Sequence, residues 1–130
     1  MKSATHGRIK TAFLGRITNR SVLFSLYKTA KLFWFASKFE GLGNVVPESL
    51  LCGTPVVTLA AGGIMQELVT NDQDGEVIDS EDPEKFAGIV NKWLNKKDID
   101  HAGIAQRARE RFDPAIIEDG YLTRFKQLLR

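Results

Sequence analysis

Short apolar runs alternate along this chain with longer segments in which apolar residues recur every three or four positions. The apolar runs that predict strands lie at 9–14, 32–35, 55–59 and 76–78. The segments with helical spacing lie at 19–30, 47–52, 65–69, 83–95, 98–112 and 116–129. Strands that alternate with helices predict a parallel sheet covered by helices. The sequence therefore indicates an α/β domain over residues 8–130, after a disordered lead at 1–7.

The aromatic residues of the strand-like runs are predicted to be buried. They are Phe13, Phe33, Trp34 and Phe35. The single cysteine, Cys52, lies at the end of a short helix beside a strand, so we expect a packing thiol and not a nucleophile. One cysteine also excludes a disulfide within the chain.

The loop before the second predicted helix carries the candidate chemistry. Gly41 and Gly43 lack a Cβ, so they allow the backbone to approach a ligand closely. The helix start presents N–H groups without a partner and a positive dipole end, which suit an anion. Its N-cap is Asn44 or Val46, and Asn44 has the better side chain for that position. Glu40 and Glu48 lie eight positions apart, and each carboxylate can accept two hydroxyl hydrogen bonds. These residues predict a site for an anion and hydroxyl groups at the carboxyl ends of the strands.

A longer pattern surrounds the two acids. Its matching positions, in register, are Ser37, Glu40, Gly41, Gly43, Glu48, Gly53, Pro55, Val56 and Val57. Further motifs lie in order before and after it, at Phe13-Leu14-Gly15, 62–69, 71–78 and Asp82-Pro83. This set resembles the retaining glycosyltransferases with two Rossmann domains (the GT-B type), in particular the large group 1 (GT4) family. The resemblance covers about residues 8–113, and Ser49 stands where that family usually has Ala.

The resemblance implies roles for individual residues. It implies that Glu48 holds the ribose hydroxyls of a nucleotide and that Glu40, the catalytic residue, lies beside the donor sugar. The loop residues whose backbone contacts the sugar or the diphosphate are then Gly41, Leu42, Gly43 and Asn44. Gly15 and Arg16, at the end of the first strand, are expected beside the nucleobase. The donor implied is a nucleotide diphosphate-sugar, and no metal ion or other cofactor is expected.

The resemblance also implies an incomplete Rossmann-like parallel sheet with flanking helices, from the C-terminal, donor-binding domain of such an enzyme. Relative to that family, the N-terminal domain that binds the acceptor is absent. The first two strands of the donor domain are absent as well, together with the Arg and Lys that bind the diphosphate. Arg16 and Lys38 are the candidates to replace those cations.

The absent strands have a consequence for pairing. In the sheet order 3-2-1-4-5-6, the strand at 9–14 is the third, so it is separated from the strands that follow it in the chain. Either it pairs elsewhere or apolar edges stay exposed. An exposed edge favours pairing with another chain, so we expect a homodimer or a strand exchange.

The expected function is the donor-binding part of a retaining glycosyltransferase that moves a sugar from a nucleotide diphosphate-sugar to a hydroxyl acceptor, as in polysaccharide biosynthesis. The chain alone is expected to be inactive. The alternative is a non-catalytic module of that ancestry that binds a nucleotide or a partner protein. A third hypothesis is a phosphosugar epimerase with the same two-domain architecture, whose His and acidic residues would lie in the absent half.

Charge is distributed unevenly, although the net charge is only +2. Residues 1–39 carry basic residues and no acid, whereas residues 40–84 carry acids and no Lys or Arg. A basic surface suits anionic lipid or nucleic acid. No basic motif interleaved with aromatic residues accompanies it. We therefore predict a solvated surface that pairs with the acidic block, and no nucleic-acid partner.

The sequence carries no signal for a membrane or for secretion. No apolar run reaches the length of a membrane span, and residues 1–10 lack the apolar core of a signal peptide. We expect the protein to be cytoplasmic, and the alternative is peripheral binding to the cytosolic face of a membrane.

Overall fold

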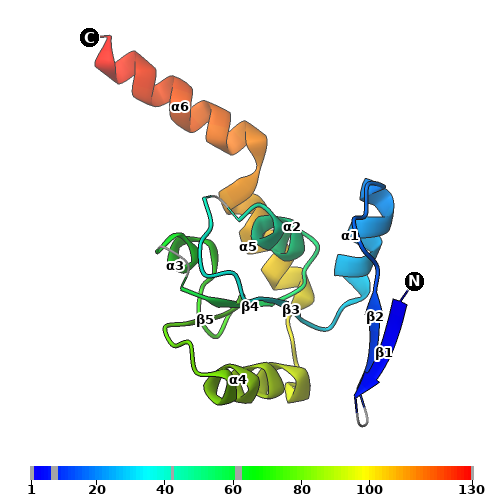
Figure 1. Ribbon diagram of the computed structural model, residues 1–130. Helices are drawn as coiled ribbons and strands as arrows, with labels where there is room; N and C mark the ends of the chain where they lie inside the picture. Colours follow the sequence, from blue (N-terminus) through cyan, green and yellow to red (C-terminus); the bar gives the residue numbers. More distant parts are fainter. Residues whose placement is uncertain (1, 7–8, 42, 61–62, 130) are drawn as a thin grey trace.

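The computed structural model describes residues 2–6, 9–41, 43–60 and 63–129 (Figure 1). The strands are β1 (Lys2–His6), β2 (Ile9–Phe13), β3 (Phe33–Phe35), β4 (Val56–Leu59) and β5 (Gly75–Ile78). The helices are α1 (Arg20–Thr29), α2 (Val45–Leu51), α3 (Ile64–Leu68), α4 (Pro83–Asn95), α5 (His101–Phe112) and α6 (Pro114–Leu128). The order of elements predicted from residue 9 onward is confirmed.

The centre of the fold is a three-stranded parallel sheet in the order β3-β4-β5. β4 is the middle strand, and its Val56 lies opposite Phe33 on one side and Gly75 on the other. Val56, Val57 and Thr58 are fully buried. A parallel strand that is covered on both faces has a continuous apolar run, and this explains the run at 55–59 in the sequence.

Helices pack on both faces of this sheet, as Figure 1 shows. On one face, α2, α3 and α5 surround a core that contains Val46, Leu50, Val56, Met65, Val69, Ile104 and Ala108. On the other face, α4 contributes Phe86 and Trp93 to a second core with Val57 and Ile78. This arrangement is the predicted Rossmann-like fold, incomplete on the β3 side.

β2 pairs antiparallel with β1 in a separate two-stranded sheet, in which Ala4 is opposite Thr11. The structure thus has a strand over Lys2–His6 where the sequence predicts a disordered lead at 1–7; residues 1 and 7 lie outside the described part. Figure 1 shows this hairpin beside α1 and away from the parallel sheet. The predicted strand at 9–14 therefore pairs within its own chain.

The parallel sheet is left with an exposed apolar edge at β3. Trp34 is 63% exposed and Phe13 is 59% exposed, so the prediction that both are buried is wrong. Trp34 lies in β3, whose outer side pairs with no described strand, and Phe13 lies in β2, which pairs with β1 in the separate two-stranded sheet and has all five of its residues exposed. Phe33 and Phe35 pack against the core as predicted.

An apolar groove of about 520 Å³ lies beside this edge. Trp34, Phe86 and Val90 line it, together with Ile9 of the hairpin. The predicted homodimer would cover such a surface, but nothing in a single chain tests it, so the dimer stays a prediction.

α1 is held to the sheet mainly through Tyr27. The helix begins where predicted, because the Asn19 side chain accepts a hydrogen bond from the Val22 N–H at 3.2 Å. The Tyr27 ring is buried and meets the Phe33 ring edge-on, with centroids 5.4 Å apart. The Tyr27 carbonyl also accepts a hydrogen bond from the Thr54 hydroxyl. α1 therefore has a fixed position relative to the loop that precedes β4.

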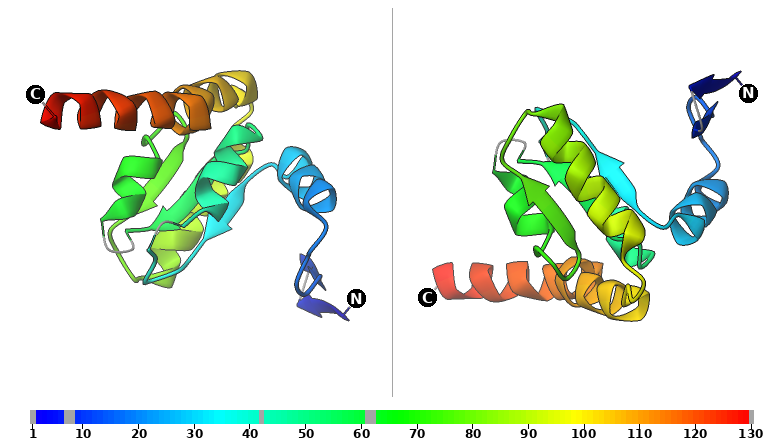
Figure 2. Two further views of the ribbon diagram at one scale, coloured as in Figure 1. Left: turned by 90° about the horizontal axis from the view of Figure 1, so that it is seen from above. Right: turned by 90° about the horizontal axis from the view of Figure 1, so that it is seen from below.

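α6 extends away from the sheet, on the side opposite the hairpin (Figure 2). None of its residues is buried. Its exposed apolar residues, together with Leu129 just after it, are Ile116, Ile117, Tyr121, Leu122, Phe125, Leu128 and Leu129. Within the described ranges, no helix has both the length and the apolar character that a membrane span requires.

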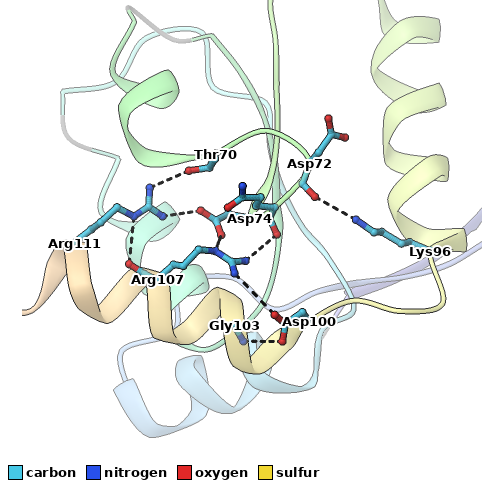
Figure 3. Close-up of polar contacts among 9 residues, drawn as sticks. Thr70, Asp72, Asp74, Lys96, Asp100, Gly103, Arg107 and Arg111 are labelled. Atoms are coloured by element: carbon cyan, nitrogen blue, oxygen red, sulfur yellow. Dashed lines mark hydrogen bonds and ion pairs between the residues drawn. The ribbon is translucent and has the colours of Figure 1, made fainter.

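A buried carboxylate connects the turn before β5 to α5 (Figure 3). Asp74 is fully buried, and its two oxygens accept hydrogen bonds from Arg107 Nε and Arg111 Nη2, each at 2.8 Å. Arg107 also donates to the Gln73 carbonyl at 3.3 Å. A buried carboxylate is tolerated only when it is paired and hydrogen-bonded, so these two arginines fix α5 against the sheet.

Two glycines allow the backbone to pack closely around the sheet. Gly75 has φ of +152°, and a Cβ there would lie 1.7 Å from the carbonyl oxygen of Val56 in β4. Gly53 has φ of +80°, and a Cβ there would lie 2.6 Å from the carbonyl oxygen of His101. His101 Nδ1 in turn lies 2.8 Å from the Gly53 carbonyl oxygen. Both glycines therefore serve the packing of the backbone.

Asp74→Ala is expected to lower the free energy of unfolding by about 3 kcal/mol, because it removes the acceptor of two guanidinium groups. Urea denaturation followed by circular dichroism measures this change. Asp98→Ala, which removes an exposed acid, is the control and should change stability by less than about 0.5 kcal/mol. Equal effects of the two substitutions would contradict the structural role of Asp74.

Gly75→Ala is expected to destabilise the chain by about 3 kcal/mol, since the added methyl group collides with the β4 backbone. Gly88→Ala in α4 is the matched control, because a Cβ at Gly88 meets nothing within 4 Å. That variant should be more stable than the native chain by roughly 0.5–1 kcal/mol, since alanine favours a helix. Thermal unfolding compares the three proteins, and a Gly75→Ala variant as stable as the native chain would show that β4 and β5 are placed wrongly.

Candidate functional site

The loops that follow β3, β4 and β5 meet at one edge of the sheet, since the three strands are parallel. Ligands of open α/β sheets bind outside the carboxyl ends of the strands, so a ligand site is expected at this edge. A small pocket of about 110 Å³ lies there, lined by Lys38, Leu59, Ala60, Ile78, Asp79, Ser80 and Glu81. The predicted site loop, which follows β3, belongs to the same edge.

The glycine loop combines exposed and buried positions. Glu40, Gly41 and Asn44 are exposed, so they are accessible to a ligand. Gly43 is buried with φ of +57°, and a Cβ there would lie 2.6 Å from Cε of Met65 in α3. Gly43 thus serves packing against α3. The predicted contact residue Leu42 lies outside the described residues.

The start of α2 offers fewer N–H groups than the sequence suggests. Asn44 is at the N-cap position as predicted, but its backbone is helical and its side chain makes no capping hydrogen bond. The Val46 N–H donates to the Gly43 carbonyl at 2.8 Å, and Pro47 has no N–H. α2 is also only seven residues long. Its first turn alone is therefore a weaker anion site than expected.

Glu48 lies in the first turn of α2 and faces α1. Its side chain is 22% exposed, and its Oε1 lies 3.3 Å from Nη2 of Arg20. Burial raises the pKa of the Tyr27 hydroxyl, and the negative charge of Glu48 raises it further. Glu48 is therefore a partly buried acceptor at the junction of α1 and α2, accessible to a hydroxyl group.

The other predicted donor-binding residues lie where β2 leads into α1. Gly15 has φ of +66° and turns the chain after β2, and a Cβ there would meet nothing within 4 Å. Arg16 is exposed in the same turn. The structure brings this segment to the candidate site through Arg20, the first residue of α1, which pairs with Glu48. Lys38, the other candidate cation, pairs with Glu81 at 2.7 Å.

Two ion pairs therefore join the basic first third to the acidic block, as the charge distribution predicts: Arg20 with Glu48 and Lys38 with Glu81. The role of Arg20 was not predicted. A signal for it exists, because a basic residue in the first turn of a helix opposes the dipole and so calls for an acidic partner.

Cys52 fits the predicted packing role. It is half-buried at the C-cap of α2, and burial raises the pKa of its thiol, an effect that the charge of Lys28 opposes. A raised pKa makes a thiol a poor nucleophile at neutral pH. Over the described ranges, no three His, Cys, Asp or Glu side chains gather as metal ligands would.

Comparison with known proteins agrees with this description. The profile of a family described as "Glycosyl transferases group 1" matches residues 2–111. An uncharacterised glycosyltransferase of Methanocaldococcus jannaschii is 34% identical over 88 residues, which are 68% of this chain and 22% of that protein. A D-inositol 3-phosphate glycosyltransferase of Acidothermus cellulolyticus is 29% identical over 97 residues, 72% of this chain and 21% of that protein.

A protein of the same name from Salinispora arenicola is 35% identical over 85 residues, 65% of this chain and 18% of that protein. The chain thus spans about a fifth of the length of these relatives. The ordered motifs, the parallel sheet that they form and the match over most of the sequence lead to one conclusion: the chain belongs to the group 1 family of glycosyltransferases.

Proposed function

We propose that this chain is the donor-binding part of a retaining glycosyltransferase that transfers a sugar from a nucleotide diphosphate-sugar to a hydroxyl acceptor. The observation that carries the proposal is the position of Glu48. Its carboxylate is partly buried and partly exposed, at the start of a helix that follows a parallel strand, and it faces the segment after β2. A carboxylate in such a place suits the two vicinal hydroxyls of a ribose.

The other parts of the donor, which are the sugar, the diphosphate and the nucleobase, can be assigned to other predicted site residues. We assign the donor sugar to Glu40, which is exposed in the glycine loop, and the diphosphate to the backbone of Gly41 and Asn44 beside it. Gly15 and Arg16 are assigned to the nucleobase, because their turn leads into α1 and so to Arg20 beside Glu48. The exposure of these groups supports the assignment.

The proposed reaction needs little acid–base help from the protein. The bond between the anomeric carbon and the diphosphate oxygen breaks, and the acceptor oxygen bonds to the same carbon on the same face. The acceptor's proton passes to an oxygen of the leaving diphosphate. Glu40, beside the sugar, would stabilise the positive charge that develops at the anomeric carbon. The proposal includes no metal ion.

A non-catalytic interaction module is the second candidate. The exposed apolar side chains of α6 and the exposed Trp34 at the sheet edge favour it, because large exposed apolar surfaces commonly mark contacts with another chain. A homodimer through the β3 edge belongs to this candidate. Sedimentation of the 130-residue chain tests it, since a monomer at all concentrations would count against it.

Glu48→Ala is expected to weaken the binding of a nucleoside diphosphate by about 10-fold or more, because it removes a charged hydrogen-bond acceptor. Ligand-observed NMR with UDP, GDP and ADP measures the binding and identifies the base. Glu84→Ala is the matched control, since Glu84 is an exposed acid in the first turn of α4. Equal affinity of the Glu48→Ala variant and the native chain would refute the ribose assignment.

Glu40→Ala should distinguish binding of the donor sugar from binding of the nucleotide. We expect it to leave the affinity for a nucleoside diphosphate within about 2-fold, and to weaken the affinity for the corresponding nucleotide diphosphate-sugar by roughly 5-fold, the cost of one charged hydrogen bond. Competition between the two ligands, measured on one sample, gives both values. An equal loss of affinity for both ligands would contradict the assignment of Glu40 to the sugar and would assign it to the nucleotide.

A further inference from the structure

Arg20 is the hydrogen-bond and charge partner of Glu48 in the structure. Its Nη2 lies 3.3 Å from Oε1 of Glu48. Among the hydrogen bonds of the described residues, this is the one that reaches the Glu48 carboxylate, and none reaches Oε2. One oxygen is thus engaged by a guanidinium group, and the other is left for a hydroxyl donor.

The position of Arg20 is electrostatically unfavourable for α1, and another contact must offset this. Arg20 is the first residue of α1, and a cation at this end of a helix opposes the dipole. The guanidinium also lies 5.1 Å from the centroid of the Phe24 ring, one turn further along the same helix. Glu48 and Phe24 together therefore hold the guanidinium at the junction of α1 and α2.

The chain offers few alternatives to Arg20 as a counter-ion. Residues 40–84, which include the whole glycine loop and α2, contain no Lys or Arg. A cation beside Glu48 must therefore come from another element. α1 supplies it, and α1 is itself fixed to the sheet by the buried Tyr27.

We propose that Arg20 is a positioning residue for ribose recognition: it holds one oxygen of the Glu48 carboxylate so that the other oxygen accepts hydrogen bonds from the ribose hydroxyls. The inference rests on the proposed function and adds a residue to it. A charge-assisted hydrogen bond from Arg20 limits the rotation of the carboxylate. Arg20 itself stays largely in solvent, with 70% of its side chain exposed, so it need not touch the ligand.

The test compares ligands that differ only in the ribose hydroxyls. The probes are the nucleoside diphosphate among UDP, GDP and ADP that binds the native chain best, and its 2′,3′-dideoxy counterpart. The quantity measured is the ratio of their dissociation constants. Arg20→Ala should reduce this ratio by roughly 2- to 5-fold, as expected for loss of a mostly exposed ion pair, and leave the dideoxy affinity unchanged.

Three further variants make the result specific. Arg20→Lys keeps the positive charge and should retain part of the preference for the ribose form. Arg20→Glu places a like charge beside Glu48 and should reduce the preference further than Arg20→Ala does. Lys28→Ala removes an exposed cation from the other end of α1 and should change nothing. Circular dichroism confirms that each variant is folded.

The outcomes separate this inference from the proposed function. If a folded native chain binds no nucleoside diphosphate, the proposed function fails and the inference fails with it. If the native chain prefers the ribose form and Arg20→Ala leaves that preference intact, the role of Arg20 alone is refuted. Tighter binding of the ribose form by Arg20→Ala would also overturn it, because Arg20 would then compete with the ligand for Glu48.

Discussion

The parallel pairing of β4 with β3 and β5 is the constraint on which the rest of the structure depends. It places the three loops that follow these strands at one edge, and it buries Val56 and Val57 between helices on both faces. The glycine loop is then held at its start by β3, which it follows, and further on by α3, whose Met65 side chain packs against Gly43. A disturbance of the β4 pairing would therefore move the glycine loop and Glu48.

Much of this arrangement could be predicted from the sequence. Continuous apolar runs predict the buried strands, and helical spacing predicts α1 and α4, which the structure shows to be capped by Asn19 and Asp82. The acids Glu40 and Glu48, with the glycines between them, predict a site at the carboxyl end of β3. These features are local, since each depends on residues within a few positions of one another.

The remaining features depend on contacts between distant parts of the chain. Asp74 binds Arg107 and Arg111, which come 33 and 37 positions later, and no local pattern relates them. Arg20 meets Glu48 across 28 positions. The exposure of Phe13 and Trp34 has a different cause. Their side chains have the character of core residues, but Trp34 lies in the outermost strand of the parallel sheet and Phe13 lies in a separate two-stranded sheet that is exposed at every position of β2.

Family membership and the geometry of the site support each other at Glu48. The family supplies the expectation of an acid that holds a ribose, and the structure has a partly buried carboxylate at the helix start, paired with a cation from the helix that follows β2. The glycine loop leads directly into the helix that carries Glu48, and the turn at Gly15 leads into α1, whose first residue, Arg20, pairs with Glu48.

The measurement that tests this account most directly is a titration of the isotope-labelled chain with UDP, GDP or ADP, followed through the backbone amide resonances in two-dimensional NMR. The account predicts that the largest shifts fall on residues 15–20 and 40–48. Shifts confined to the groove around Trp34 and Phe86, or no shifts in a folded sample, would contradict a nucleotide site at Glu48.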